Sequence, residues 1–250
     1  MTLADFSKTL LVACLFPAAL LCGADETPKP LRRLTLGVHV NYYPLPLIKS
    51  TYIVQISNNP VAQYNYYGAS DSPKWGPGAM AEYRLTDHLS VAAEIHFHHE
   101  DYTVTDNILS GYNTSTTGGD NRPLTTTVQT SAINVYEIPL MARYYGLWSH
   151  GWKRRLYISG GGQFLHVGKI RTGNDFIYPN GTTDYNENPA IPNKTNDLGA
   201  VVGVGMRFVD EFHIRVSPEV RYIRWQGPAI LGTGYRSAPG QVEANLSVSF

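Results

Sequence analysis

The sequence predicts an all-β chain that closes into an antiparallel transmembrane β-barrel of eight strands, connected up and down. Three observations predict this fold. The last ten residues, Gln241 to Phe250, alternate polar and apolar without exception, and a period of two places one set on each face of a strand. Seven upstream segments alternate similarly, and their connections are alternately short and long. After residue 24 no run of 18 apolar residues occurs, so no membrane-spanning helix is expected.

The first residues have the features of a secretory signal peptide. Lys8 supplies a positive charge, residues 10–21 are almost wholly apolar, and small residues at 22–24 precede a polar stretch. We therefore expect residues 1–24 to be a signal peptide and residues 25–33 to be a short periplasmic lead. Residues 34–250 are then the barrel.

The composition excludes several kinds of site. Cys14 and Cys22 are the two cysteines, and both lie in the predicted signal peptide. The exported chain is therefore expected to have no disulfide and no thiolate metal site. Cleavage directly before Cys22, as in a lipoprotein, is the alternative. The chain has 20 basic and 20 acidic residues, so we expect no nucleic-acid partner. Its 17 Tyr and 23 Gly fit a barrel with aromatic belts and a polar lumen.

Eight segments carry the strand pattern: 34–43, 79–85, 89–98, 135–145, 154–166, 198–208, 212–222 and 241–250. Tight turns are expected at 86–88, 146–153 and 209–211. Long extracellular loops are expected at 44–74, 104–131, 168–196 and 226–240. Segments 52–55 and 64–67 can pair as a hairpin rising from the barrel rim, and a ten-strand barrel that includes them is the alternative. Pro139 is unusual inside a strand, and a β-bulge there would explain it.

Two stretches resemble known outer-membrane proteins. The closing strand, with Leu246, Val248 and Phe250 on one face, resembles the C-terminal assembly signal of bacterial outer-membrane barrels. The stretch from Tyr136 to Tyr145 resembles a motif of the OmpA-like and PorT-like small barrels. This resemblance implies a monomer in the outer membrane of a Gram-negative-type bacterium, inserted by the barrel-assembly machinery and in contact with lipids and lipopolysaccharide. It also implies a non-catalytic role in surface interaction, membrane integrity or secretion.

The polar strand faces carry charges of both signs: Glu82, Arg84, Glu94, Glu137, Arg143, Arg207, Arg215, Glu219, Arg221 and Glu243. Eight strands enclose a space that side chains fill, so these charges must be paired there to offset their desolvation. We predict an ion pair between Arg221 and Glu243 across the last hairpin, and one between Glu94 and Arg143. A lumen filled in this way conducts ions poorly.

The sequence predicts no catalytic residue, cofactor or metal site. It has no G-x-S-x-G, H-E-x-x-H or P-loop pattern. His96 and His98 share one strand face and are weak candidates for metal ligands, but no third protein ligand can be identified. Whether these histidines can bind a metal depends on where both of them and Glu137 lie relative to the lumen. An outer-membrane lipid-modifying enzyme and a narrow passive channel are the alternative functions.

Overall fold

The computed structural model describes residues 33–58, 61–70, 74–110, 125–146, 155–187, 195–210, 212, 214–228, 231–232 and 235–250. The chain divides into two units, Met1–Arg32 and Arg33–Phe250, and the second contains all of these residues. The predicted signal peptide lies outside them, as do residues 25–32 of the predicted lead. Within the described part, no helix is long and apolar enough to cross a membrane.

The described residues form β-strands almost throughout. The strands are β1 (Leu34–Tyr43), β2 (Ile48–Asn58), β3 (Val61–Ser70), β4 (Lys74–Arg84), β5 (Leu89–Ser110), β6 (Thr125–Tyr145), β7 (Leu156–Ile177), β8 (Thr183–Glu187), β9 (Asn196–Met206), β10 (Phe208–Val209), β11 (Arg215–Trp225), β12 (Leu231–Gly232), β13 (Tyr235–Ser237) and β14 (Gly240–Ser249). Every pairing between them is antiparallel.

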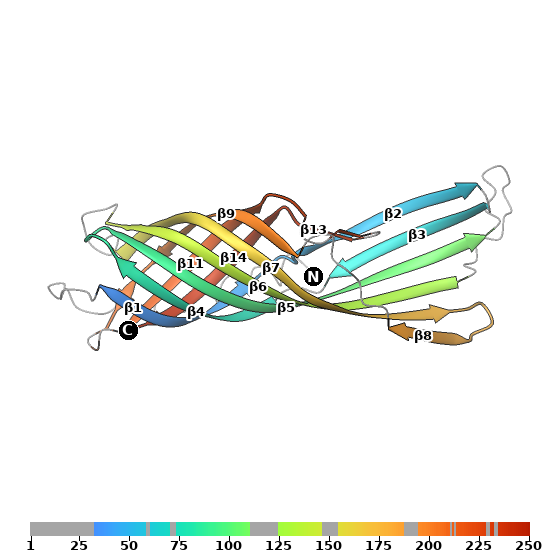
Figure 1. Ribbon diagram of the computed structural model, residues 1–250, viewed down its shortest axis with the longest axis horizontal. Helices are drawn as coiled ribbons and strands as arrows, with labels where there is room; N and C mark the ends of the chain where they lie inside the picture. The colour runs from blue at the N-terminus through green and yellow to red at the C-terminus, as the bar shows by residue number, and fades with distance from the viewer. Residues whose placement is uncertain are drawn as a thin grey trace, which may run out of the picture. The chain divides into compact units, whose positions relative to one another are not determined.

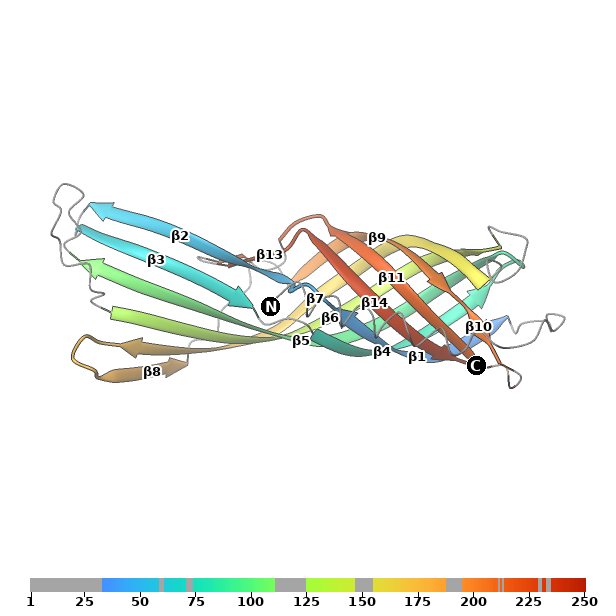
Figure 2. The same ribbon diagram turned by 180° about the vertical axis from the view of Figure 1, so that it is seen from behind.

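A closed ring of 8 strands is the centre of the fold (Figure 1). Its order is β1-β4-β5-β6-β7-β9-β11-β14, and β14 pairs back onto β1. Figure 2 shows this closure, with β14 beside both β11 and β1. Because β2 and β3 stay outside the ring, the eight-strand prediction is confirmed and the ten-strand alternative is wrong.

The ring carries its apolar side chains on the outside. Leu36, Leu140 and Val202 are each more than half exposed, while Glu94, Glu137 and Arg221 on the opposite strand faces are buried. A barrel in water needs the reverse arrangement, because exposing apolar area to water is unfavourable. An apolar outer band around a polar interior is the arrangement of a transmembrane β-barrel.

In three of the predicted long loops, most of the described residues belong to strands. β5, β6 and β7 are 22, 21 and 22 residues long, about twice the 9–11 residues that a tilted strand needs to cross a bilayer. Beyond the ring they pair with one another, β3 joins β5, β2 joins β3, and β8 joins β7. We call this part, with β13 and β12 at the other edge of β2, the sheet extension. The expected hairpin within 44–74 is therefore present as β2 and β3, and it belongs to this larger sheet.

The predicted β-bulge is in a different place. The β6–β7 register runs without a shift past Pro139, which lies opposite Gln163, and it shifts between Ile133 and Val135. This shift lies where β6 and β7 pass from the ring into the sheet extension, and bulges are common at barrel rims. Pro139 is accommodated differently: the β5–β6 ladder omits the pairs that Glu94 and Ile95 would make with Pro139 and Ile138, because proline has no N–H to donate.

An apolar core lies next to the polar lumen. It consists of Leu47, Ile48, Tyr102, Val104, Ile133, Val135, Met141, Leu165, Val167, Ile170, Val201, Ile223 and Trp225, all of them at most 4 % exposed. Most of these residues lie where the ring strands approach the sheet extension. At this end of the ring the inward-facing side chains, such as Val135 and Leu165, are apolar. Their outward-facing neighbours Tyr136 and Phe164 are apolar or aromatic as well. The barrel is therefore closed on this side by packed side chains.

Candidate functional site

Two arginines organise the buried charges of the lumen. Arg143 of β6 lies 2.9 Å from Glu82, 2.6 Å from Glu94 and 3.0 Å from Glu219. Arg221 of β11 lies 2.7 Å from Glu94 and 2.9 Å from Glu219, with Glu243 at 3.4 Å. These side chains are at most 5 % exposed. Bridging carboxylates between two guanidiniums offset the cost of removing the charges from water.

The structure brings together both predicted ion pairs. Arg221 and Glu243 are directly opposite in the β11–β14 register, but their 3.4 Å contact is the longest that Arg221 makes in the network. The shortest contact of Arg221, at 2.7 Å, crosses the lumen to Glu94 of β5. Sequence analysis missed this bridging role of Glu94, because contacts between strands that are not neighbours depend on how the barrel closes. The order of hairpins in the sequence does not predict such contacts across the lumen.

A glycine makes room for the network. Gly203 of β9 is flanked by Ser159 of β7 and Arg221 of β11. A Cβ atom at this position would lie 2.6 Å from Ser159 Oγ and 2.9 Å from Glu219 Oε1. Ser159 in turn donates a hydrogen bond to Glu219 Oε1 at 2.5 Å. The absent side chain therefore lets Glu219 reach both its hydroxyl partner and the arginines.

A second polar layer contains histidines. His96 and His98 of β5 are both buried on the lumen side, as is Glu137 of β6, which settles their position relative to the lumen. His96 Nε2 lies 3.0 Å from Glu94 Oε2. Its Nδ1 lies 3.8 Å from both Glu137 Oε2 and Glu243 Oε1.

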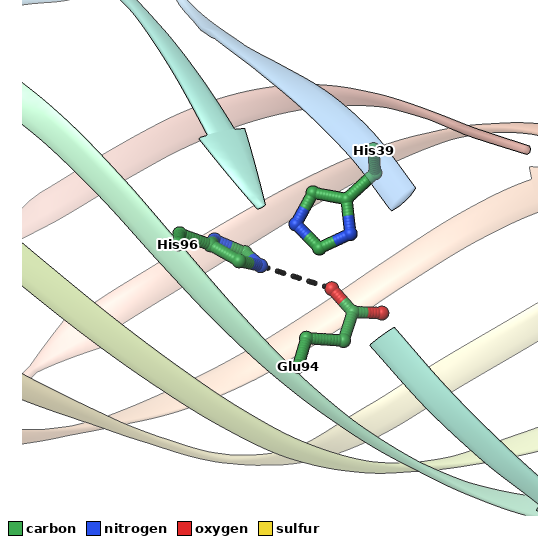
Figure 3. Close-up of side chains that lie close together, drawn as sticks. All are labelled: His39, Glu94 and His96. Carbon is green, nitrogen blue, oxygen red and sulfur yellow. Dashed lines mark hydrogen bonds and ion pairs between the residues drawn. The ribbon is translucent and has the colours of Figure 1, made fainter. Parts of the chain in front are cut away.

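Two sets of donors in this layer have a spacing that a metal ion can bridge, and both contain His96. One set is His39, Glu94 and His96, drawn in Figure 3, where the rings of His39 and His96 lie around the Glu94 carboxylate. The other is His96, Glu137 and Glu243. Of the two predicted candidate ligands, His96 thus has partners with metal-binding chemistry. Among the described residues His98 belongs to neither set.

The proposed assembly signal lies on the outer face of the barrel. Leu246, Val248 and Phe250 are 49 %, 37 % and 64 % exposed, while Ser247 and Ser249 between them are buried on the lumen side. β14 forms the seam of the ring by pairing with β1 and β11. Recognition of these residues during membrane insertion remains a prediction.

Comparison with known proteins gives fold likenesses alone. No protein-family model and no curated protein matches the chain. Neisserial surface protein A is 12% identical with a TM-score of 0.40, covering 89% of this chain and 100% of its own. The attachment invasion locus protein Ail of Yersinia pestis is 8% identical with a TM-score of 0.35, covering 88% and 100%. An outer membrane channel of Pseudomonas putida is 11% identical with a TM-score of 0.24, covering 91% and 98%. This chain is thus similar in fold, at low sequence identity, to solved bacterial surface and outer membrane proteins.

Proposed function

We propose that the chain is an integral outer-membrane protein whose closed barrel holds the sheet extension outside the cell as a binding surface. The observation that carries this proposal is the length of β5, β6 and β7, which continue well past the span that a bilayer requires. A barrel whose role is confined to the bilayer would not need ordered strands beyond the ring. Lipids and lipopolysaccharide are the proposed partners of the apolar band, and a monomer suffices for this role.

The extension presents a surface with binding character. Tyr52 and Tyr67 stack with ring centroids 4.7 Å apart and are 58 % and 46 % exposed. Ile53 and Ile56 on the same hairpin are also exposed. Exposed tyrosine and aliphatic side chains on a rigid sheet are typical of surfaces that bind other macromolecules.

A passive channel is the less favoured alternative. The ion network around Arg143 and Arg221 fills one part of the lumen, and the apolar core closes the side toward the extension. Ions passing through would have to displace both layers. Planar-bilayer recordings of the purified protein should therefore show no stable open state, and a reproducible conductance would favour the channel.

A lipid-modifying enzyme is the other alternative. The titratable groups of the lumen are buried and engaged with one another, so they offer no access to a lipid on the outer surface. Mass spectrometry of lipid A from cells with and without the protein should show the same species. A new acylation pattern that depends on the protein would favour the enzyme.

The binding role is tested on intact bacteria. Cells expressing the full chain are compared with cells expressing a variant in which residues 48–70 are replaced by a short turn. We expect the full chain alone to increase retention on host-cell monolayers, matrix-protein films or bacterial lawns. Equal surface amounts and equal heat-dependent gel mobility provide the control. Retention that is absent for both, or equal for both, would contradict the proposal.

A further inference from the structure

Two buried carboxylates of the histidine layer have weaker charge partners than the other carboxylates of the lumen. Within the described part of the chain Glu137 forms no ion pair with an arginine, and the pair of Glu243 with Arg221 is 3.4 Å long. Glu137 accepts hydrogen bonds on Oε2 from Tyr43 at 3.1 Å and from Gln163 at 2.8 Å. Its Oε1 has no hydrogen-bond partner among the described residues, and neither has Oε2 of Glu243. Both side chains are 0 % exposed. Buried polar atoms are normally satisfied, so these two oxygens indicate a missing partner.

His96 directs a free nitrogen at the other oxygen of each carboxylate, Oε2 of Glu137 and Oε1 of Glu243. Its Nδ1 has no hydrogen-bond partner within the described part of the chain, and it lies 3.8 Å from an oxygen of each carboxylate. Three donors around a Zn²⁺ ion at about 2.1 Å and near-tetrahedral angles are about 3.4 Å apart. Small side-chain rotations therefore bring the three donors to metal-binding distance.

We propose that His96, Glu137 and Glu243 bind one divalent transition-metal ion, such as Zn²⁺, inside the barrel. One imidazole and two carboxylates are a donor set that such ions accept. The ion supplies positive charge next to two carboxylates whose negative charge the arginines do not fully neutralise.

The neighbouring contacts are those of a supported metal site. His96 Nε2 is 3.0 Å from Glu94 Oε2, so that nitrogen is the donor and Nδ1 remains available as a ligand. A carboxylate that orients a ligating histidine in this way is a recurrent feature of metal sites. Arg143 and Arg221 fix Glu94, and Tyr43 and Gln163 fix Glu137.

The other donor set is less suitable. In Figure 3 the Glu94 carboxylate lies beside both His39 and His96, but the same carboxylate accepts hydrogen bonds from both Arg143 and Arg221. A divalent cation there would lie against two guanidiniums, and Coulomb repulsion in a buried site is strong. In the set of His96, Glu137 and Glu243, the guanidinium contact among the described residues is that of Arg221 with Glu243 at 3.4 Å, longer than the contacts of Arg143 and Arg221 with Glu94. This set also retains two negative charges.

A protonated His96 that acts as a further cation beside the arginines explains the same contacts, so the test must measure metal. The full chain is folded into detergent micelles with ZnCl₂, desalted, and analysed for zinc by mass spectrometry. Heat-dependent gel mobility reports folding for each variant. We expect one zinc per folded wild-type chain and a loss of at least tenfold in both His96→Gln and Glu137→Gln.

His39→Ala and His99→Ala are the matched controls. The side chain of His99 is 50% exposed, outside the lumen, and His39 belongs to the less suitable set. Both should retain zinc, and a chelator should remove it slowly from folded protein and at once from unfolded protein. Folded wild type without zinc would overturn the proposal. So would loss in His39→Ala with retention in Glu137→Gln. If His96→Gln does not fold, Glu137→Gln decides, because it keeps the size of the side chain.

Discussion

At the residue scale, Arg143 is the side chain on which most of the lumen charge depends, because three carboxylates lie within 3.0 Å of it. Arg143→Met keeps much of the volume but removes the charge. Removing one partner of a buried ion pair typically costs about 3–5 kcal/mol, and we expect a loss of this size in urea unfolding in lipid vesicles. Arg224→Met is the control, because Arg224 is exposed. An equal effect of both substitutions would contradict the network's role.

Gly203 provides a second residue-scale prediction. A Cβ there would be 2.6 Å from Ser159 Oγ, whereas a Cβ at Gly160 would come no closer than 3.9 Å to any other atom. Overpacking a filled interior typically costs about 1–3 kcal/mol. Gly203→Ala should therefore lower the free energy of unfolding by about that amount. Gly160→Ala should be near neutral in the same vesicle assay, and the reverse order would show that the network tolerates displacement.

Sequence reasoning worked at this scale where the chain pairs with its neighbour. The opposition of Arg221 and Glu243 followed from the position of the last turn, and the structure has that register. It failed for Glu94, which reaches Arg221 across the lumen. It also gave no sign that Glu137 and Glu243 meet at His96, since β6 and β14 are not neighbouring strands.

At the element scale, the β2–β3 hairpin lies outside the ring, and we expect the barrel to fold without it. Among the described residues, β2 pairs with β3 and β13, and β3 joins the extended part of β5. Replacing residues 48–70 by a short turn removes Ile48 from the apolar core but breaks no pairing of the ring. We expect the variant to keep its heat-dependent gel mobility in detergent. A variant that no longer folds would show that the extension is part of the folding unit.

Asp106 makes the sheet extension sensitive to pH. It lies on β5 opposite Tyr66 of β3, and burial raises the pKa of its carboxyl above the ordinary value. The folded extension therefore binds the proton more tightly than the unfolded one, so its stability rises as the pH falls from 7 toward about 4. Protease resistance of the extension should increase over this range in the wild type.

The comparison that isolates Asp106 uses two variants. Asp106→Asn cannot ionise, so it should be more resistant than wild type at pH 7, and the difference should vanish at low pH. Asp175→Asn changes an exposed carboxyl of the same extension and should follow wild type throughout. A difference between Asp106→Asn and wild type that is independent of pH would contradict the role of ionisation.

Prediction of the elements from sequence was limited by the polar strands. The ring strands were visible because one face must be apolar toward lipid, as in Val242 to Phe250. The extension lies beyond the ring, and its strands carry polar residues on both faces, as in Thr125–Thr130. Such segments have the composition of loops, so β8 and the ends of β5, β6 and β7 could not be recognised by alternation. Of β2 and β3, the sequence indicated the hairpin segments 52–55 and 64–67 but not the full strands.

At the scale of the whole molecule, the protein is a membrane-spanning barrel with apolar side chains on its outer face and a polar lumen that side chains fill. The apolar outer face, the ion network and the apolar core toward the extension are three parts of one arrangement. Each part is explained by the same physical requirement. Strands can cross lipid only when their backbone groups pair around a closed ring and their apolar side chains face outward.

The most direct test is lipid contact along β14. Single cysteines are placed in turn at Ala244, Asn245, Leu246, Ser247 and Val248, labelled with a fluorophore and folded into vesicles that contain quencher-bearing lipids. We predict strong quenching at Ala244, Leu246 and Val248 and weak quenching at Asn245 and Ser247, with a period of two. Quenching without this alternation, or stronger quenching at the buried positions, would contradict the barrel's orientation toward lipid.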